Sequence, residues 1–284
     1  MAKKIIRLSE DEKLQKKLQS EKKESLSNWQ PTKENKEKAT RFRLFAALAW
    51  IFAILVQLAV IYYILRNGVE IKLWLAIVGI ILDLAFAVTG GFLWKKSNKI
   101  DPPSEKNGFL FFMQSQLGLF IAIVAFLPLV IFIFMNKDLD KKQKGILGSI
   151  AVVALVAAGL LGTEFNPSSK EEYAVQTQTV QVLTDSDQVI GTKSGKYYHL
   201  YEDCRYIKSS NVRELFFGTV GEVHANNSKI SSGEDGLCPV CKARALEIKG
   251  WTEEEFQEEL KKEGLENASS QEVEVFLDEI IEAA

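Results

Sequence analysis

The sequence predicts a multi-pass α-helical membrane domain of four spans, followed by a small α+β soluble domain that ends in acidic helices. Two observations carry this prediction. Residues 44–162 are overwhelmingly apolar, whereas residues 247–284 hold thirteen acids against three lysines. The 284 residues then divide into a basic tail, a membrane domain, a linker with a first strand, a compact module and an acidic helical tail: 1–43, 44–162, 163–189, 190–249 and 250–284.

The basic tail holds thirteen Lys or Arg against seven acids. Its run SEDE, residues 9–12, has the spacing of a capping box and predicts a short helix that includes Leu14 and Leu18. The apolar face of that helix is thin. We therefore interpret the tail as a solvated segment that touches anionic lipid headgroups, in preference to a nucleic-acid-binding arm.

Four stretches are long and apolar enough to cross a bilayer, whose core of about 30 Å needs roughly 20 helical residues. Residues 44–65 carry no charge, and residues 73–94 have a tryptophan near each end, where such rings settle at membrane interfaces. Residues 109–135 include Pro128, which neighbouring helices can accommodate. Residues 146–162, rich in Ala and Gly, are the shortest candidate.

The charges beside the spans predict the orientation, because Lys and Arg favour the cytoplasmic side. The basic tail places the N-terminus inside, and the loop 95–108, with four lysines, then also lies inside. Four spans return the C-terminal half to the cytoplasm of a bacterial cell, at the inner membrane. The loop 136–145 also holds four lysines but would face outward, which leaves a three-span protein with an exported domain as the alternative. The first apolar run starts too late and is too long for a cleaved signal peptide.

Asp83 is the single acid within the predicted spans, and an ionisable group at membrane depth is costly. Gln57, Gln114 and Gln116 lie in the same apolar stretches, so we expect a polar cluster around Asp83. We prefer the interpretation in which a protonated or amide-bonded Asp83 holds the helices together. Transport or proton relay through Asp83 is the alternative.

Beyond the spans, residues 174–183 (AVQTQTVQVL) alternate polar and apolar side chains as a half-buried strand does. Residues 191–201 (GTKSGKYYHLY) predict a hairpin with its turn at Ser194-Gly195, which places His199 on or just after a strand. Residues 236–241 (GLCPVC) have the form of a zinc knuckle, and residues 242–249 predict a helix.

All three cysteines and one of the two histidines occur in these fragments, as His199-x₄-Cys204 and Cys238-x₂-Cys241. Zn²⁺ takes four N or S ligands in a tetrahedron, and a Cys₃His set leaves no open position for water. We therefore expect a structural zinc ion to staple a module whose own core is thin. A disulfide or redox pair is one alternative, although it leaves one cysteine over, and ordinary buried cysteines are the other.

The pattern GKxYHx₄C followed by GLCx₂C, in residues 195–204 and 236–241, resembles the small metal-binding module at the ends of some bacterial thermonuclease-like proteins. It is distantly similar to the metal-binding domain of Ada-type DNA-repair proteins. The resemblance covers residues 190–245 and implies metal binding at the same His and three Cys. The insert 215–235 departs from the short form of the pattern, and no nuclease body is recognisable, so nuclease activity does not follow.

Little in the remaining sequence favours an enzyme. His224, in the insert, is expected at the surface rather than as a fifth ligand, and two histidines leave little material for a catalytic set. Thr252 begins a capping box and a helix to about Gly264, and Ser270 caps a second acidic helix with an apolar stripe. Such a stripe docks on its own domain more often than on a partner.

We thus expect a non-enzymatic membrane protein that displays a cytoplasmic zinc domain as a sensor, adaptor or scaffold. A small transporter or channel-like bundle with a regulatory zinc domain is the alternative. A membrane-tethered nucleic-acid-binding module is a weaker one, because the soluble half is acidic. Membrane lipid, and a protein bound at the acidic C-terminal helices, are the expected partners. The sequence names no ligand, pathway or oligomeric state.

Overall fold

The computed structural model describes residues 29–209, 214–227, 229–230 and 236–262. They fall into two compact units. The helical unit comprises described residues 29–171 and 224–227, and the cysteine unit comprises 172–223, 229–230 and 236–262. The described elements of the chain are α2 (Lys33–Asn67), η1 (Gly68–Glu70), α3 (Leu73–Ile100), α4 (Gly108–Ser115), α5 (Leu117–Met135), α6 (Lys141–Gly162), α7 (Lys170–Thr184), β1 (Gln188–Thr192), α8 (Arg205–Ser209), β2 (Leu215–Thr219), α9 (Val220–Asn226), α10 (Pro239–Lys249) and α11 (Glu253–Lys262).

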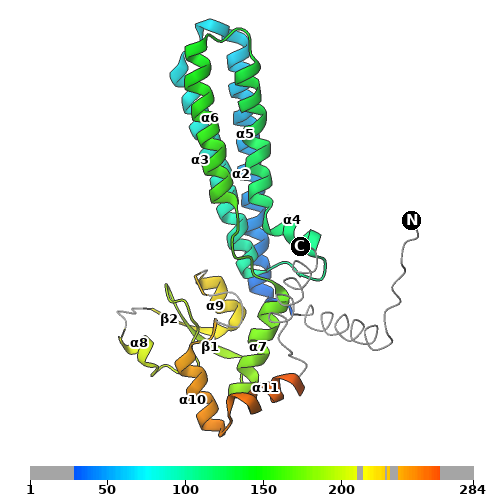
Figure 1. Ribbon diagram of the computed structural model, residues 1–284, viewed down its shortest axis with the longest axis vertical. Helices are drawn as coiled ribbons and strands as arrows, with labels where there is room; N and C mark the ends of the chain where they lie inside the picture. The colour runs from blue at the N-terminus through cyan, green and yellow to red at the C-terminus, as the bar shows by residue number, and fades with distance from the viewer. Residues whose placement is uncertain (1–28, 210–213, 228, 231–235, 263–284) are drawn as a thin grey trace, which may run out of the picture. The chain divides into compact units, whose positions relative to one another are not determined.

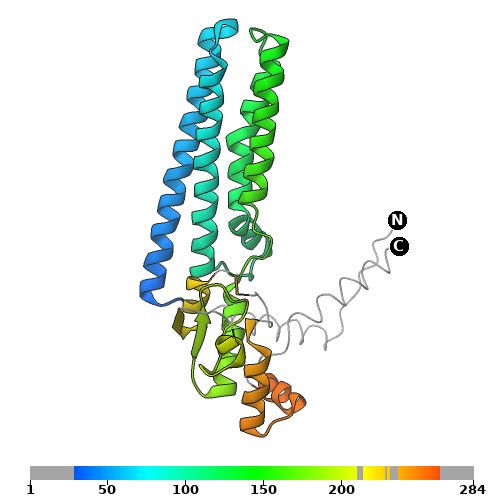
Figure 2. The ribbon, with the colours of Figure 1, turned by 90° about the vertical axis from the view of Figure 1, so that its left-hand side faces the viewer.

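In the helical unit, α2, α3, α5 and α6 run side by side (Figures 1 and 2). They are the four helices of the described chain that are long and apolar enough to cross a membrane. Their buried faces are rich in small side chains, which let helices approach closely. Buried alanines on these faces include Ala53, Ala76, Ala87, Ala122, Ala125, Ala151, Ala154 and Ala158.

Two close approaches show why the small residues are needed. A Cβ atom added to Gly162 in α6 would lie 2.7 Å from the carbonyl oxygen of Gly118 in α5. In the same way, a Cβ atom on Gly90 in α3 would lie 2.3 Å from the indole nitrogen of Trp50 in α2. That indole donates a hydrogen bond to the Ala87 carbonyl at 3.3 Å. Side chains at either glycine would push the helices apart.

The predicted third span, 109–135, is not one continuous helix, because α4 and α5 are separate helices on either side of Gln116. The Gln114 carbonyl accepts hydrogen bonds from the Trp94 indole at 2.8 Å and from the Asn98 amide at 3.2 Å. Both donors come from α3. A carbonyl that is engaged by a neighbouring helix contributes less to its own helical ladder, and the chain bends there.

The fourth candidate span is longer than the predicted 146–162. It is α6, whose first turn is closed by a capping box in which Asp140 accepts from the Gln143 backbone at 2.7 Å and Gln143 from the Asp140 backbone at 3.0 Å. The helix therefore starts among the lysines of the preceding loop. Within α5, Pro128 lies inside the helix without ending it.

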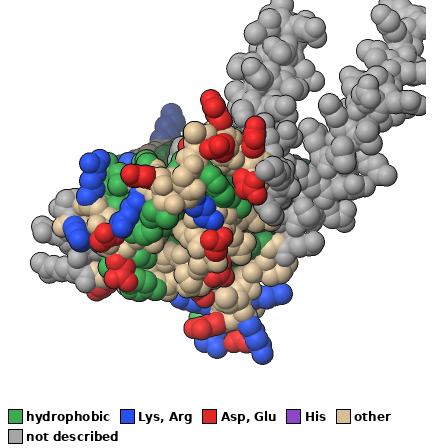
Figure 3. All heavy atoms as spheres, turned by 90° about the horizontal axis from the view of Figure 1, so that it is seen from below, with side chains coloured by type: hydrophobic (Ala, Val, Ile, Leu, Met, Phe, Trp, Pro, Cys, Tyr) green, Lys and Arg blue, Asp and Glu red, His purple; other side chains and the backbone are tan. Residues whose placement is uncertain are grey.

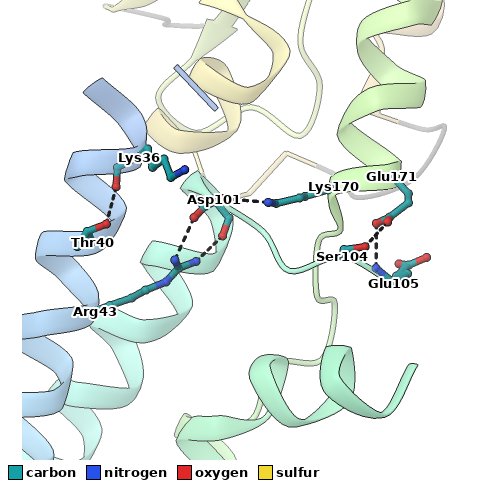
Figure 4. Close-up of polar contacts among 8 residues, drawn as sticks. All are labelled: Lys36, Thr40, Arg43, Asp101, Ser104, Glu105, Lys170 and Glu171. Carbon is teal, nitrogen blue, oxygen red and sulfur yellow. Dashed lines mark hydrogen bonds and ion pairs between the residues drawn. The ribbon is translucent and has the colours of Figure 1, made fainter. Parts of the chain in front are cut away.

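Polar contacts join α2 to the C-terminal end of α3 (Figure 4). Arg43 donates from Nη1 to Oδ2 of Asp101 at 2.9 Å and from Nη2 to the Asp101 carbonyl at 2.7 Å. Lys170 adds a second cation, with Nζ 3.8 Å from Oδ1 of Asp101. The Glu171 carboxylate accepts hydrogen bonds from the Ser104 hydroxyl and from the Glu105 backbone N–H. Charged groups thus gather where the apolar stretches end.

In the cysteine unit, the strand predicted at 174–183 is wrong, since these residues belong to the helix α7. Buried side chains in α7 recur at three- and four-residue intervals, at Tyr173, Gln176, Val180 and Leu183. This spacing puts them on one face of a helix. The alternation of polar and apolar residues that suggested a strand is present in the same segment, but the burial of the side chains follows the helical period instead.

The predicted hairpin at 191–201 is also revised. The strand β1 pairs antiparallel with β2, so that Ile190 lies opposite Phe217. Residue His199 does return to β1, but only through an isolated antiparallel bridge to Ile190. The insert after the first ligand pair therefore supplies the second strand of the sheet.

The helices predicted after the knuckle are confirmed where the structure describes them. Residues 242–249 lie in α10, and the capping box at Thr252 is confirmed by reciprocal bonds with Glu255 at 2.7 and 3.2 Å. It opens α11, whose Phe256 is buried in the core of the unit. The predicted helices at residues 9–18 and after Ser270 lie outside the described residues.

Candidate metal centre

Backbone pairing brings the first and third ligands together. The segment that carries His199 exchanges hydrogen bonds with Ile190 of β1, at 2.7 and 2.8 Å. On its other edge, Tyr198 donates to the Gly236 carbonyl at 2.9 Å and accepts from the Cys238 N–H at 2.9 Å. This strip of paired backbone fixes His199 next to the knuckle, although nearly forty residues separate them in the sequence.

The cysteines lie at the beginnings of two helices. Cys204 precedes α8, and its carbonyl accepts from the Ile207 N–H at 2.9 Å. Cys238 is the N-cap of α10, with Pro239 at the first helical position, and Cys241 lies in the first turn. Helix N-termini carry partial positive charge and present free N–H groups, which favours thiolates.

The side chains converge on a common point. One nitrogen of His199 and the sulfurs of Cys204, Cys238 and Cys241 all lie within 4.8 Å of one another. A tetrahedral site with Zn–S bonds of about 2.3 Å and a Zn–N bond of about 2.05 Å places its sulfurs about 3.8 Å apart, and a sulfur and nitrogen about 3.6 Å apart.

Two of the ligand separations meet that expectation closely. The Sγ atoms of Cys204 and Cys238 are 3.8 Å apart, and Sγ of Cys241 is 3.7 Å from Nδ1 of His199. A disulfide requires about 2.05 Å between sulfurs, and all three cysteines are free. The predicted Cys₃His set is thus assembled with the spacing of metal ligands, and the disulfide alternative finds no support here.

Burial makes this group a poor place for charges without a metal. Exposed fractions of the four residues are between 0% and 5%. Burial raises the pKa of Cys241 to about 12, raises that of Cys238, and lowers that of His199. A dication at the centre would favour the thiolate form of the cysteines and would coordinate the neutral imidazole. The residues therefore fit a metal ion, although without one their burial keeps them uncharged.

Backbone amides support the thiolate form of two ligands. N–H groups of Val240 and Cys241 favour ionisation of Cys238, and those of Leu200 and Tyr201 favour ionisation of Cys241. Such outer contacts orient ligands and tune a metal site. The motif spacing does not reveal the Leu200 and Tyr201 donors, because these depend on how the two loops fold against each other.

Within the described residues, Asp83 makes no hydrogen bond to the glutamines that were predicted to surround it. Asp83 is fully buried, and Gln57 is buried on the facing helix α2. Gln116 instead uses its side chain on the Glu164 backbone, donating at 2.7 Å and accepting at 3.2 Å. Gln114 lies in α4 with an exposed side chain.

His224 differs from the prediction of a surface residue. It is only 1% exposed, lies in the helical unit and does not belong to the Cys₃His group. Burial, and secondarily the positive charge of Lys99, lower the pKa of His224 to about 3. Lys99 itself is held by the Asn166 carbonyl at 2.8 Å and the Ser168 hydroxyl at 3.0 Å.

Comparisons with protein-family models, with curated proteins and with solved structures find no match to this chain. The resemblance to the thermonuclease-like and Ada-type modules therefore gains no support from relatives. The structure supports its coarser content, a His and three Cys that could hold a metal ion.

Proposed function

We propose that this protein is a multi-pass membrane protein that displays a domain stapled by structural zinc, and that the domain acts as a sensor, adaptor or scaffold rather than as an enzyme. The closed Cys₃His group is the observation that carries the proposal. All four protein ligands are present and buried, which leaves no open position for a substrate or an activated water.

The outward faces of the four long helices support membrane insertion. Large apolar side chains that are more than half exposed occur on each of them, for example Phe52, Phe92, Val124 and Val153. A water-soluble bundle of this kind would expose far more contiguous apolar surface than soluble proteins carry. Lipid tails would cover it without cost.

Sulfur ligands in a tetrahedral arrangement favour Zn²⁺ over hard cations such as Mg²⁺ or Ca²⁺. We expect full-length protein purified in detergent under reducing conditions to contain one Zn²⁺ per chain. Metal analysis that finds no zinc, or finds iron in its place, would contradict the proposal. A Cys238→Ser variant with full zinc content would contradict the ligand assignment.

We place the zinc domain on the cytoplasmic side of a bacterial inner membrane. The basic tail favours an inside N-terminus, and an even number of spans then brings the cysteines back to a reducing compartment. The 22-residue length of α6 supports the fourth span. A reporter active only in the cytoplasm, fused after Ala284, should be active. Activity solely from a reporter that works outside would instead favour three spans.

Nucleic acid is a poor partner for the zinc domain. The face drawn in Figure 3 intersperses basic with acidic side chains and shows no continuous basic surface. Phosphate-backbone binding depends on clustered Lys and Arg. We therefore favour a protein partner, and the acidic C-terminal segment is the first region to test by deletion after residue 262.

A small transporter is the second candidate function, because Asp83 is fully buried inside the helical unit. The change Asp83→Asn keeps the shape of the side chain and removes its titratable group. Loss of a measurable proton or ion flux in vesicles that contain the variant would favour transport. An unchanged flux would exclude transport through Asp83.

A further inference from the structure

Asp83 has an unusual environment. Its side chain is 0% exposed, and neither carboxylate oxygen has a hydrogen-bond partner within the described parts of the chain. Buried polar groups are nearly always paired, since an unpaired one forfeits its hydration. A carboxyl group in this position therefore needs a physical reason to remain there.

Contacts between α2 and α3 define what lies opposite Asp83. Gly79 in α3 lies against Val60 in α2. Because the two helices are antiparallel, moving one turn along each brings Gln57 to the depth of Asp83. Gln57 is itself buried, with 4% exposed. An amide can donate to a carboxyl group or accept from it, whichever protonation state is present.

The other two helices offer only apolar groups at this depth. Gly91 in α3 and Gly162 in α6 lie side by side, so Asp83 and Ala154, each eight residues earlier, are level with one another. The start of α5 also touches Gly162, and eight residues further into α5 is Phe126. Both Ala154 and Phe126 are buried, at 3% and 0% exposure.

Charged side chains are remote from Asp83. The four apolar stretches contain no other Asp, Glu, Lys, Arg or His. Along α3, Lys72 and Lys95 are eleven and twelve residues away, which corresponds to about 16 and 18 Å of helix. Arg66 in α2 and Lys144 in α6 lie about 14–15 Å from the same depth. No cation in these stretches is close enough to stabilise a carboxylate.

We propose that Asp83 is a proton-binding site, occupied at neutral pH, so that the side chain is a neutral carboxylic acid inside the helical unit. In water an aspartic acid is ionised roughly 1,000-fold over its protonated form at pH 7. Burying an unpaired carboxylate in a low-dielectric interior opposes ionisation more strongly than this ratio favours it. This inference stands whichever of the two functions above is correct.

A proton fits the site better than a metal cation does. Hard cations such as Ca²⁺ take six to eight oxygen ligands, whereas Gln57 is the one polar side chain that the described helices bring to this depth. The phenols of Tyr62 and Tyr63 are the remaining titratable groups of the four stretches, and they lie at the end of α2, where the Tyr63 hydroxyl accepts from the Lys72 N–H at 3.0 Å.

The test uses dicyclohexylcarbodiimide, an apolar reagent that adds to protonated carboxyl groups. The acid proton moves to a carbodiimide nitrogen, the carboxyl oxygen bonds to the central carbon, and rearrangement leaves a stable N-acylurea. Full-length protein in lipid vesicles is treated at pH 7, and peptides are mapped by mass spectrometry. We expect labelling of Asp83 at least about tenfold above that of the exposed Asp138, because an ordinary carboxyl is only about 0.1% protonated at this pH.

Matched substitutions sharpen the result. Asp83→Asn should abolish the label, Asp83→Glu should retain it, and Asp138→Asn should leave it unchanged. Labelling should fall as the pH is raised and should not respond to added sodium chloride. Protection by sodium at constant pH would overturn the proposal in favour of a cation site. Infrared difference spectra between wild type and Asp83→Asn provide a second measurement that needs no reagent access. Loss of a carboxylate band in the variant, with no protonated C=O band lost, would overturn it as well.

Discussion

The helical unit and the cysteine unit are stabilised by different kinds of contact. In the helical unit, four long helices bury stripes of small residues against each other, and many weak contacts share the stabilisation. In the cysteine unit, a two-stranded sheet and short helices surround four ligand atoms that converge on one point. The difference implies that the loss of one ligand side chain can unfold the cysteine unit, whereas the loss of one packing contact only destabilises the helical unit.

Removing one of the proposed metal ligands should produce the largest effect. Binding of a structural zinc contributes roughly 10–16 kcal/mol to folding in small zinc domains, so Cys238→Ser should unfold the cysteine unit. We expect rapid hydrogen exchange throughout residues 190–249 and unchanged exchange in α2, α3, α5 and α6. The control is Asp203→Asn, which changes an exposed non-ligand beside Cys204 and should retain protection. Equal loss of protection in both units would show that they fold as one.

A larger side chain at the tightest helix contact should have the next largest effect. Gly162→Leu would force a Cβ atom to within 2.7 Å of the Gly118 carbonyl oxygen. Overpacking of this kind costs about 3 kcal/mol, which denaturant titration in detergent would measure. Gly145→Leu changes the same helix where nothing lies within 4 Å and should cost much less. Zinc content should be normal in both variants, and its loss in Gly162→Leu would contradict the separation of the two units.

The buried imidazole of His224 should make the stability of the helical unit depend on pH. Its folded pKa of about 3 lies below the ordinary value near 6.5, so below pH 6.5 the unfolded chain binds a proton that the folded chain does not. Stability should therefore fall as the pH decreases from about 6.5 toward 3, by about 2 kcal/mol at pH 5.

His224→Gln should remove that part of the pH dependence. Acid also releases zinc from thiolate ligands, so the quantity to compare is the difference between wild type and variant at each pH. Unfolding free energies measured at pH 7 and pH 5 should diverge. Parallel curves for the two proteins would contradict the assignment.

The contact between Arg43 and Asp101 should have the smallest effect. Asp101→Asn removes the ion pairs with Arg43 and Lys170 but leaves the bond from Arg43 to the Asp101 carbonyl, at 2.7 Å, in place. We expect a loss of about 1 kcal/mol, typical of a partly exposed pair. Denaturant titration at low and high salt provides the measurement, because screening should shrink the difference. An effect of similar size from Asp138→Asn would show that net charge, rather than this contact, is responsible.

Several features could be predicted from the sequence because they depend on local composition. A run of about twenty apolar residues forms a helix wherever backbone groups must pair internally, and the four long helices follow. The four candidate metal ligands stood out because Cys and His are scarce in this chain and occur at ligand spacing. The capping box at Thr252 needed only neighbouring residues.

Tertiary contacts decided the rest. The break at Gln116 depends on Trp94 and Asn98 reaching across from α3, and the helical state of α7 depends on which of two periodic patterns finds a core to bury against. His224 is buried and belongs to the helical unit, whose other described residues lie far earlier in the chain, and its polar neighbours in the insert do not indicate this. The deciding partners lie outside the local sequence, 16 and 20 residues away for the Gln114 carbonyl and more than fifty for His224. Local preferences differ by about 1 kcal/mol or less per residue, so a single such contact is enough to override them.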